Sequence, residues 1–267
     1  MGTYCSHCGE KRRDRTDWKL SSIANETFAE ITNLEHSKLW QTFRLLVFKP
    51  GQLTREYWSG RRKRFLGPVK LYLVFFALAL VLYSIHRPTA VYDVRTLMAA
   101  NPVGWLPRLL DELADKSGLP ASQFAQEVNS RWQSYISMSQ VIYPLFVALA
   151  LKVLLRRRGL YFAEHLIFAL HLLAFMFLSL SVLWPLFALF GFETSIETFT
   201  PAYVLITAGS IAWTAVYLLL AMRRAYAERW LPAIIKSAAV YLTYFLTSMF
   251  FMYAALAIAI ALTSRAG

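Results

Sequence analysis

The stretch YFAEHLIFALHLLAFMFLSLSVLWPLFALF, residues 161–190, is the longest apolar run in the chain. An α-helix rises 1.5 Å per residue, so about 20 apolar residues cross the roughly 30 Å hydrocarbon core of a bilayer. This stretch is longer than that and contains Pro185, which predicts a kink or a tilt near its end. It therefore predicts a transmembrane helix and sets the class of the whole protein.

Four further apolar runs predict an all-α, polytopic membrane protein with five transmembrane helices. Of the 267 residues, 57% are hydrophobic and only 16% are charged, which is not the balance of a soluble domain. The predicted spans are residues 68–86, 139–155, 161–190, 201–222 and 237–262. Because the sequence before the first span is rich in charge, we expect that span to be a retained anchor rather than a cleaved signal.

The net charge of +12 is distributed along the chain by membrane side. Thirteen Lys and Arg precede residue 68 against seven Asp and Glu, whereas residues 87–134 carry five of each. Basic residues recur at 156–158 and 223–236, whereas the only charged residues in 191–200 are acidic. The positive-inside rule then predicts a cytosolic N-terminus and an external C-terminus in a cell membrane. No nucleic-acid motif interleaves with these charges, so we expect no nucleic-acid partner.

The membrane domain, residues 68–262, follows two predicted cytosolic segments and contains one outer insertion. Residues 1–25 form a basic head, and residues 26–67 predict amphipathic helices broken at Pro50 and Gly51, which we expect on the inner membrane surface. Residues 87–134 predict two amphipathic helices outside. These helices fit a lid, a partner surface or simple interfacial packing.

Cys5 and Cys8, the only cysteines, form a Cys-x-x-Cys-Gly knuckle that looks like half of a zinc ribbon. A cytosolic placement argues against a structural disulfide. Tetrahedral zinc needs four ligands, and this knuckle supplies two. The interpretations that stay open are a second knuckle that was lost or lies upstream, one ion shared by two chains, and a vestigial knuckle without metal.

Four basic residues directly precede the first span: Arg61, Arg62, Lys63 and Arg64. At the headgroup level each contributes about 1 kcal/mol of attraction to anionic lipid. They either only set the topology or bind anionic lipid headgroups. Membrane lipids are thus the predicted partners, together with a partner protein or a second copy of the chain.

Residues 161–190 also hold Glu164, the only acidic residue within any predicted span, and two histidines. Counted from Leu160, Glu164 lies about 6 Å deep and His171 about 16 Å deep, near the bilayer midplane. Helical geometry puts Glu164 and His171 on one face and points His165 away. We expect Lys152, at a matching depth in the second span, to pair with Glu164, because an isolated charge there costs several kcal/mol.

Hydroxyl side chains follow helical spacing along both of the last two spans. They predict either a hydrated cavity ending near His171 or interhelical hydrogen bonds. In the first case the likeliest donors to His171 are tyrosines of the last span. The stripe residues are Thr207, Ser210, Thr214 and Tyr217 in the fourth span, and Ser237, Tyr241, Tyr244 and Ser248 in the fifth.

Three segments together resemble the bacterial membrane-protein family catalogued as domain of unknown function 3667. The first is the Cys-x-x-Cys-Gly head. The others are a Pro-Gly/Tyr-x-x-Gly-x-Arg segment and a Glu-His-x5-His helix, formed here by Pro50, Gly51, Tyr57, Gly60 and Arg62, then by Glu164, His165 and His171. The resemblance covers roughly residues 5–175 and implies a bacterial inner-membrane protein without an assigned reaction.

Three classes of function fit this sequence, and the first is favoured. It is a non-catalytic module that binds lipid or a partner protein and assists an envelope or transport process. The second is a proton- or solute-coupled transporter that uses Glu164 and His171, against which no inverted repeat is visible. The third is a lipid-modifying enzyme with either residue as acid or base, against which carboxylates are few and no nucleophile motif is present.

The topology is testable with reporter fusions. Fusions after residue 67, within 95–130, and after residues 158, 195 and 226 should report cytosol, outside, cytosol, outside and cytosol in turn, because the basic loops alternate in that order. A cytosolic signal from the 95–130 fusion would contradict the five-span prediction.

Overall fold

The computed structural model describes residues 36–86, 94, 105–189 and 201–266. Within these residues the regular structure is helical and no strand occurs. The basic head with Cys5 and Cys8, and the helical pattern before residue 36, lie outside the described residues, so the zinc hypothesis stays a prediction.

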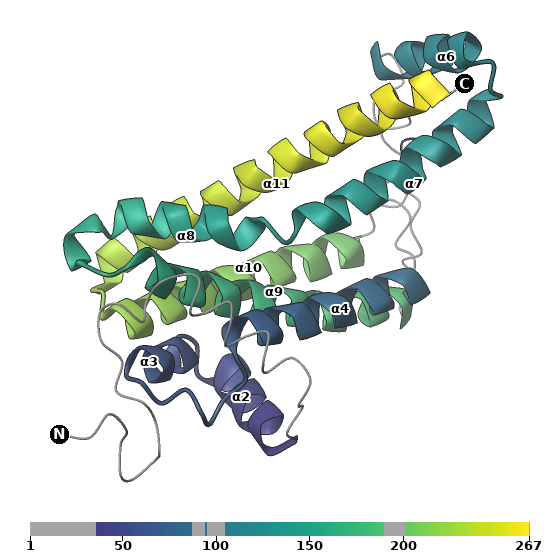
Figure 1. The fold of residues 1–267 in the computed structure, drawn as a ribbon. Coiled ribbons are helices and arrows are strands. Elements are labelled where there is room, and N and C mark those ends of the chain that lie inside the picture. The colour runs from purple at the N-terminus through teal and green to yellow at the C-terminus, as the bar shows by residue number, and fades with distance from the viewer. Residues whose placement is uncertain (1–35, 87–93, 95–104, 190–200, 267) are drawn as a thin grey trace.

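The helices run antiparallel or obliquely in one elongated bundle, with α2 and α3 beneath one end of it (Figure 1). In chain order they are α2 (His36–Phe48), α3 (Gln52–Trp58), α4 (Pro68–His86), α6 (Trp105–Ser117), α7 (Ala121–Ser139), α8 (Tyr143–Leu154), the 3-10 turn η2 (Arg156–Arg158), α9 (Phe162–Leu189), α10 (Pro201–Tyr226) and α11 (Trp230–Ala266). Four of these, α4, α9, α10 and α11, are long and apolar enough to cross a bilayer, and the bent pair α7 and α8 is a candidate fifth. The all-α, multi-pass class predicted from the sequence is confirmed.

Helix α9 lies at the centre of the bundle. Of its candidate span 67% is buried inside the protein, against 33% for α4, 17% for α10 and 22% for α11. It packs most extensively against α4, and α8, α10 and α3 also contact it. Residues 162–189 therefore form the centre of the bundle, whereas most of α10 and α11 is not buried by other parts of the protein.

The second predicted span differs from a single helix over residues 139–155. Helix α8 has 12 residues, too few to cross a bilayer, and it meets α7 at a bend of 44°. Pro144 in the first turn of α8 explains the break, because proline has no N–H to donate to the Gln140 carbonyl four residues earlier. The Tyr72 hydroxyl and the Tyr143 N–H donate to that carbonyl instead, at 2.6 Å and 3.2 Å.

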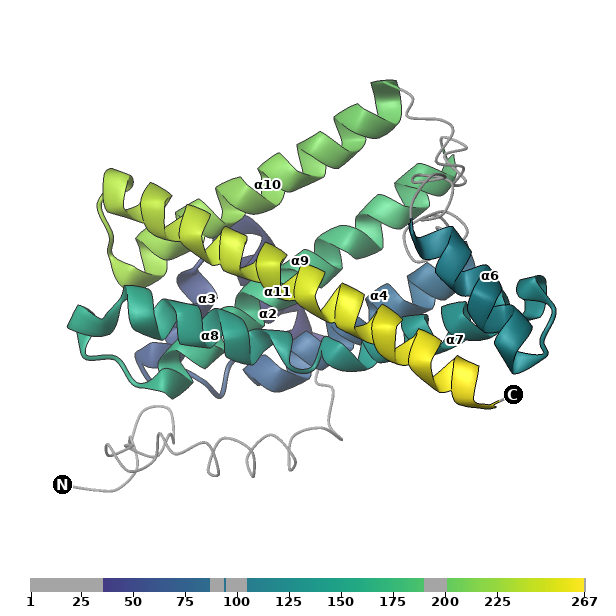
Figure 2. The ribbon, with the colours of Figure 1, turned by 90° about the horizontal axis from the view of Figure 1, so that it is seen from above.

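Helix α11 extends past the central bundle as one side of an arm. Its 37 residues span about 55 Å, far more than a bilayer core. Along its C-terminal half it packs against α6 and α7 in a second core, where Trp132 and Val128 of α7 are fully buried beside Ala255 and Ala259. The Trp132 indole donates to the Met252 carbonyl at 3.0 Å. In Figure 2 this arm diverges from α10, which stands apart at its N-terminal end.

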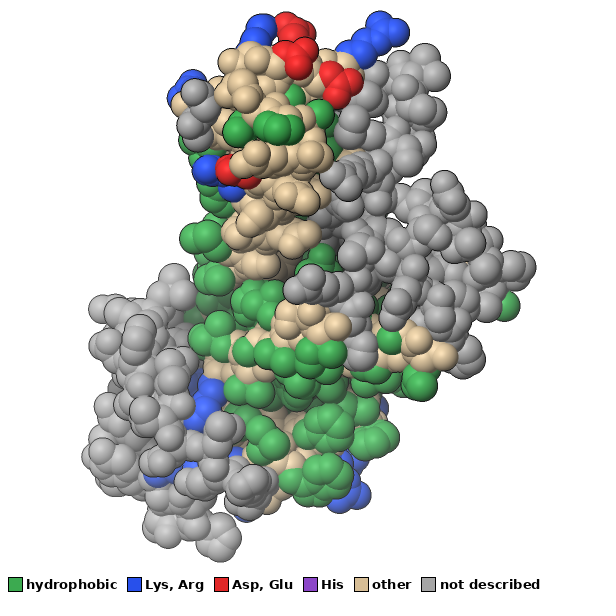
Figure 3. All heavy atoms as spheres, turned by 90° about the vertical axis from the view of Figure 1, so that its right-hand side faces the viewer, with side chains coloured by type: hydrophobic (Ala, Val, Ile, Leu, Met, Phe, Trp, Pro, Cys, Tyr) green, Lys and Arg blue, Asp and Glu red, His purple; other side chains and the backbone are tan. Residues whose placement is uncertain are grey.

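Charged side chains of both signs gather at the end of the arm on the face drawn in Figure 3, whereas the charged side chains lower on that face are basic. Acidic and basic side chains gather at the top, over α6, whereas hydrophobic side chains predominate below them. Asp111, Glu112, Asp115 and Lys116 of α6 are exposed, and Glu112 pairs with Lys116 at 2.6 Å. This distribution fits an α6 that lies in water beyond the hydrocarbon.

The α2–α3 hairpin packs against α9 and α10 of the bundle, and its expected place on the inner membrane surface stays a prediction. Gly51, between the two helices, has φ +76° and touches the backbone of Ala221 in α10. A Cβ at Gly51 would lie 2.5 Å from the Ala221 carbonyl oxygen. Only glycine combines this backbone conformation with so close an approach.

Hydrogen bonds to main-chain groups fix the docked hairpin. Tyr217 of α10 donates to the Leu46 carbonyl at 2.8 Å, and Arg224 donates to the Pro50 carbonyl at 2.9 Å. The Leu66 N–H donates to Thr42 of α2 at 3.0 Å, and the Leu66 carbonyl accepts from Tyr57 of α3 at 2.7 Å. The hairpin is thereby tied both to α10 and to the segment that leads into α4.

We expect Gly51→Ala to displace the hairpin, because the added methyl group meets the backbone of Ala221. The loss should exceed about 2 kcal/mol in the free energy of unfolding, measured by thermal denaturation in detergent. Gly60→Ala is the matched control, since Gly60 has φ +88° but nothing within 4 Å of its Cβ position. Equal losses for the two variants would mean that backbone conformation, and not the close approach, decides the stability.

Candidate functional site

His171 contacts the docked hairpin and not the hydroxyl stripes of α10 and α11. Its Nδ1 lies 2.9 Å from the Thr54 hydroxyl of α3, and its ring packs against the edge of Tyr57 at 5.4 Å between centroids. Only 3% of the residue is exposed. The expectation that Tyr241 or Tyr244 is its hydrogen-bond partner is wrong, because α3 occupies the side of α9 that His171 faces.

His165 faces a different neighbour, Tyr226 at the end of α10. Its Nδ1 lies 3.0 Å from the Tyr226 hydroxyl, and the two rings stack at 5.7 Å. The residue is fully buried. The Nε2 atoms of both histidines are buried without a hydrogen-bond partner among the described residues. The two imidazoles thus contact α3 and α10 separately, each through a hydroxyl group.

The predicted ion pair between Lys152 and Glu164 is not formed. The Lys152 ammonium donates to the Leu160 carbonyl at 2.6 Å, at the end of the connection between α8 and α9. The Glu164 carboxylate accepts from the Tyr161 N–H at 2.7 Å and so satisfies a free donor at the start of α9. Each charged group therefore bonds to a main-chain group near the end of a helix. The sequence analysis had instead expected the two groups to pair with each other inside the hydrocarbon.

Two residues of the α10 hydroxyl stripe bond within their own helix, and the buried Thr207 hydroxyl has no partner among the described residues. Ser210 donates to the Thr207 carbonyl at 2.8 Å, and Thr214 donates to the Ser210 carbonyl at 3.1 Å. Tyr217 is the exception, since it reaches Leu46 of α2 and its ring stacks on Phe175 at 3.4 Å between centroids. The Tyr217 bond is of the interhelical kind that the sequence analysis gave as the alternative to a hydrated cavity.

The space between α9, α10 and α11 is too small for a hydrated channel. It measures about 10 Å³, and Thr214, Tyr241 and Tyr244 are among its lining residues while His171 is not. That volume is at the threshold for one water molecule. Ser248 is half-buried, and Ser237 is buried with its hydroxyl unpartnered among the described residues. The space that Thr214, Tyr241 and Tyr244 line therefore neither holds a channel nor reaches His171.

Half of the basic stretch before α4 is engaged with the hairpin. Arg61 pairs with Glu56 of α3, and Arg62 donates to the Tyr57 carbonyl at 3.1 Å. Burial raises the pKa of Glu56, but its hydrogen bonds with Arg61 and Gln52 outweigh that effect and hold the pKa below the ordinary value. Lys63 and Arg64 are exposed. Whether this stretch binds anionic headgroups therefore stays a prediction from the sequence.

Glu228, which the sequence analysis did not single out, joins two loops on the side of the hairpin. Its carboxylate accepts from Arg158 in η2 at 2.9 Å and from Lys236 in α11 at 2.7 Å, and its side chain is 5% exposed. Burial raises the pKa of Glu228, but the hydrogen bonds and charges of Lys236 and Arg158 outweigh burial and hold the pKa below its ordinary value. The signal in the sequence was a single acid among four basic residues in 223–236.

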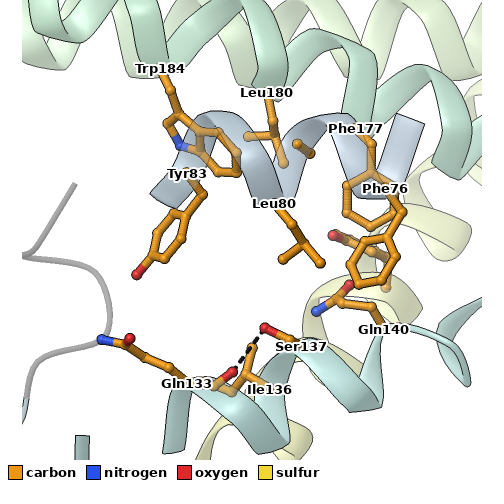
Figure 4. Close-up of a pocket in the computed structure, with 12 residues that line it drawn as sticks. Phe76, Leu80, Tyr83, Gln133, Ile136, Ser137, Gln140, Phe177, Leu180 and Trp184 are labelled. Carbon is orange, nitrogen blue, oxygen red and sulfur yellow. Dashed lines mark hydrogen bonds between the residues drawn. The ribbon is translucent and has the colours of Figure 1, made fainter. Parts of the chain in front are cut away.

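A larger cavity lies between α4, α7 and α9. Its volume is about 120 Å³, and it is half open to the surroundings of the protein. Figure 4 shows side chains of α4 and α9 on one side of it and side chains of α7 on the other. The lining residues are Phe76, Ala79, Leu80, Tyr83, Gln133, Ile136, Ser137, Gln140, Phe177, Leu180, Trp184 and Tyr244. We refer to it below as the lateral cavity.

No cluster of three or more potential metal ligands occurs in the part of the chain that the structure describes.

These features define a multi-pass helical membrane protein with a docked hairpin at one end and a lateral cavity between its spans. A family model described as protein of unknown function (DUF3667) matches residues 36–80, which comprise α2, α3 and most of α4. The match confirms the family resemblance seen in the sequence. Searches of the curated proteins and of the solved structures gave no match.

The Glu228 junction has a testable pH dependence. Because the folded-state pKa of Glu228 is depressed, its stabilising contribution is complete above the ordinary value of 4.5 and is lost as the pH falls through the folded-state pKa. Glu228→Gln should therefore lower the free energy of unfolding by about 1–3 kcal/mol at pH 7. The difference from the wild-type protein should shrink below pH 4.5, as measured by thermal denaturation in detergent.

Glu112→Gln is the matched control for Glu228→Gln. Glu112 also pairs with a lysine, but 61% of its side chain is exposed, so water screens the pair and its removal should change little. A Glu228→Gln protein as stable as this control at pH 7 would contradict the structural role of the junction.

Proposed function

We propose that this protein is a non-catalytic, lipid-binding module of the bacterial inner membrane, with its N-terminus in the cytosol and the lateral cavity as its binding site. The observation that carries the proposal is the position of the cavity among the membrane spans. Phe76 and Tyr83 lie about 12 Å and 22 Å along α4 from its first residue, inside the hydrocarbon. A cavity that opens at that depth opens onto lipid and not onto water.

The composition of the cavity supports the same ligand. Most of its lining is aliphatic or aromatic, with Phe76, Phe177 and Trp184 as the largest side chains. Apolar cavities with a few convergent polar groups are the usual form of small-ligand sites. An acyl chain fits such a lining, and burial of a chain contributes about 0.8 kcal/mol for each CH₂ group.

Transport or catalysis at Glu164 and His171 has less support than lipid binding. Glu164 interacts with the first turn of α9, and His171 is covered by Thr54 and Tyr57 of the hairpin. Neither residue lines the lateral cavity. The location in the inner membrane is supported by the family resemblance, and the cytosolic N-terminus by the alternation of basic loops.

Lipid binding can be tested by filling the lateral cavity. A diacylglycerol that carries a diazirine in one acyl chain should cross-link to α4, α7 or α9 in the reconstituted protein. Leu80→Trp should reduce this labelling about five- to tenfold, because the indole occupies the space of the chain. Leu78→Trp is the matched control, since Leu78 is 39% exposed and Leu80 37%, but only Leu80 lines the cavity. Equal labelling of both variants would refute the proposed site.

A further inference from the structure

The two sides of the lateral cavity differ in chemistry. Side chains from α4 and α9 form a wall that is aromatic and aliphatic apart from the polar atoms of Tyr83 and Trp184, whereas α7 and the residue after it present amide and hydroxyl groups beside Ile136 (Figure 4). Gln133, Ser137 and Gln140 make this second, polar wall. An amphiphile, and not a purely apolar chain, matches a cavity with two such walls.

The polar wall runs along the depth of the first predicted span, between levels that lie inside its two ends. The backbone carbonyl of Gln140 accepts from Tyr72, which is only about 6 Å along α4, and Gln133 lines the cavity with Tyr83, about 22 Å along it. These levels bracket the middle of a bilayer core of roughly 30 Å. A polar group bound there has left the headgroup layer.

Gln140 brings hydrogen-bonding capacity that the protein does not use. Its side-chain amide has no hydrogen-bond partner among the described residues, and the residue is half-buried. Ser137 donates to the Gln133 carbonyl at 2.9 Å, which leaves the oxygen lone pairs of Ser137 to accept. A ligand hydroxyl at this place can pair with the Gln140 amide and with the Ser137 oxygen, and such pairing is stabilising where water is scarce.

The wall also excludes charge. None of the lining residues is Asp, Glu, Lys, Arg or His. A phosphate at this depth would be an unpaired charge in a medium of low dielectric constant, which is far more costly than an unpaired hydroxyl. The cavity therefore discriminates against anionic headgroups at the same place where it offers partners to neutral ones.

We propose that the lateral cavity binds an uncharged, hydroxyl-bearing lipid headgroup, of the glycerol or sugar type, drawn below the membrane surface. The hydroxyls bond to Gln140 and Ser137, and an acyl chain lies along the aromatic wall of α4 and α9. This inference rests on the proposed function, because it names the class of lipid that the same cavity takes.

Competition against the diazirine-labelled diacylglycerol tests the headgroup class. The full chain is reconstituted in phosphatidylcholine vesicles and challenged with glucosyl diacylglycerol or with phosphatidylglycerol of the same acyl chains. Glucosyl diacylglycerol should suppress the labelling at a concentration about fivefold lower, the effect of about one hydrogen bond. Equal or better competition by phosphatidylglycerol would overturn the inference and leave the proposed function standing. No labelling of the unaltered protein would overturn both.

Two variants on the α7 side locate the preference. Gln140→Leu should bring the two competitors to equal potency, because it removes the unused amide. Gln126→Leu is the matched control, an exposed glutamine of α7 that does not line the cavity, and it should keep the preference. A preference unchanged by Gln140→Leu would overturn the assignment of the headgroup to Gln140. The competition in the unaltered chain needs no variant, so a misfolded variant does not remove the test.

Discussion

A chain in a bilayer must satisfy its main-chain N–H and C=O groups within the protein, and this constraint organises most of the contacts found here. Helices satisfy it along the spans, so the exposed carbonyls occur where helices end or break. Side chains reach those carbonyls from other elements. The carbonyls of Leu46, Pro50, Leu66, Gln140 and Leu160 accept from Tyr217, Arg224, Tyr57, Tyr72 and Lys152 respectively. Side chains that bond to the main chain thus join elements that are distant in the sequence.

Two distant segments of the family resemblance meet in the structure. The Pro-Gly/Tyr-x-x-Gly-x-Arg segment forms the docked hairpin, and the Glu-His-x5-His segment forms the first turns of α9 beside it. Thr54 and Tyr57 contact His171, and the Trp58 indole donates to the Glu164 carbonyl at 3.3 Å. Glycine at 51 permits the hairpin to approach α10 closely enough for these contacts. Structural contacts alone therefore account for these residue types, and no catalytic role is needed to explain them.

The spans could be predicted from the sequence because apolar length alone determines them, and all but one of the predicted spans match single helices. The neighbours of polar residues could not be predicted in this way. Helical spacing gives the face of α9 on which His171 lies, but not whether α3 or α11 covers that face. Lys152 and Glu164 were paired on depth alone, whereas both lie within reach of free main-chain groups at helix ends, which compete well for a charge. Thr54, Tyr226 and Glu228 went unnoticed because their roles depend on tertiary contacts.

The lateral cavity follows from the one place where a span breaks. Pro144 ends the regular hydrogen bonding of α7 and α8, and the bend of 44° turns α7 away from the line of α8 and toward the arm with α11. Tyr72 holds the break against α4 through the Gln140 carbonyl, so α7 stays close to α4 there and diverges beyond it. The polar face of α7 then borders an open space. Burying that face against closely packed apolar helices would cost free energy, because its polar groups would lose their hydrogen-bond partners. The break thus creates both the volume of the cavity and its polar wall, and a lipid with a neutral polar group is the ligand that suits the two together.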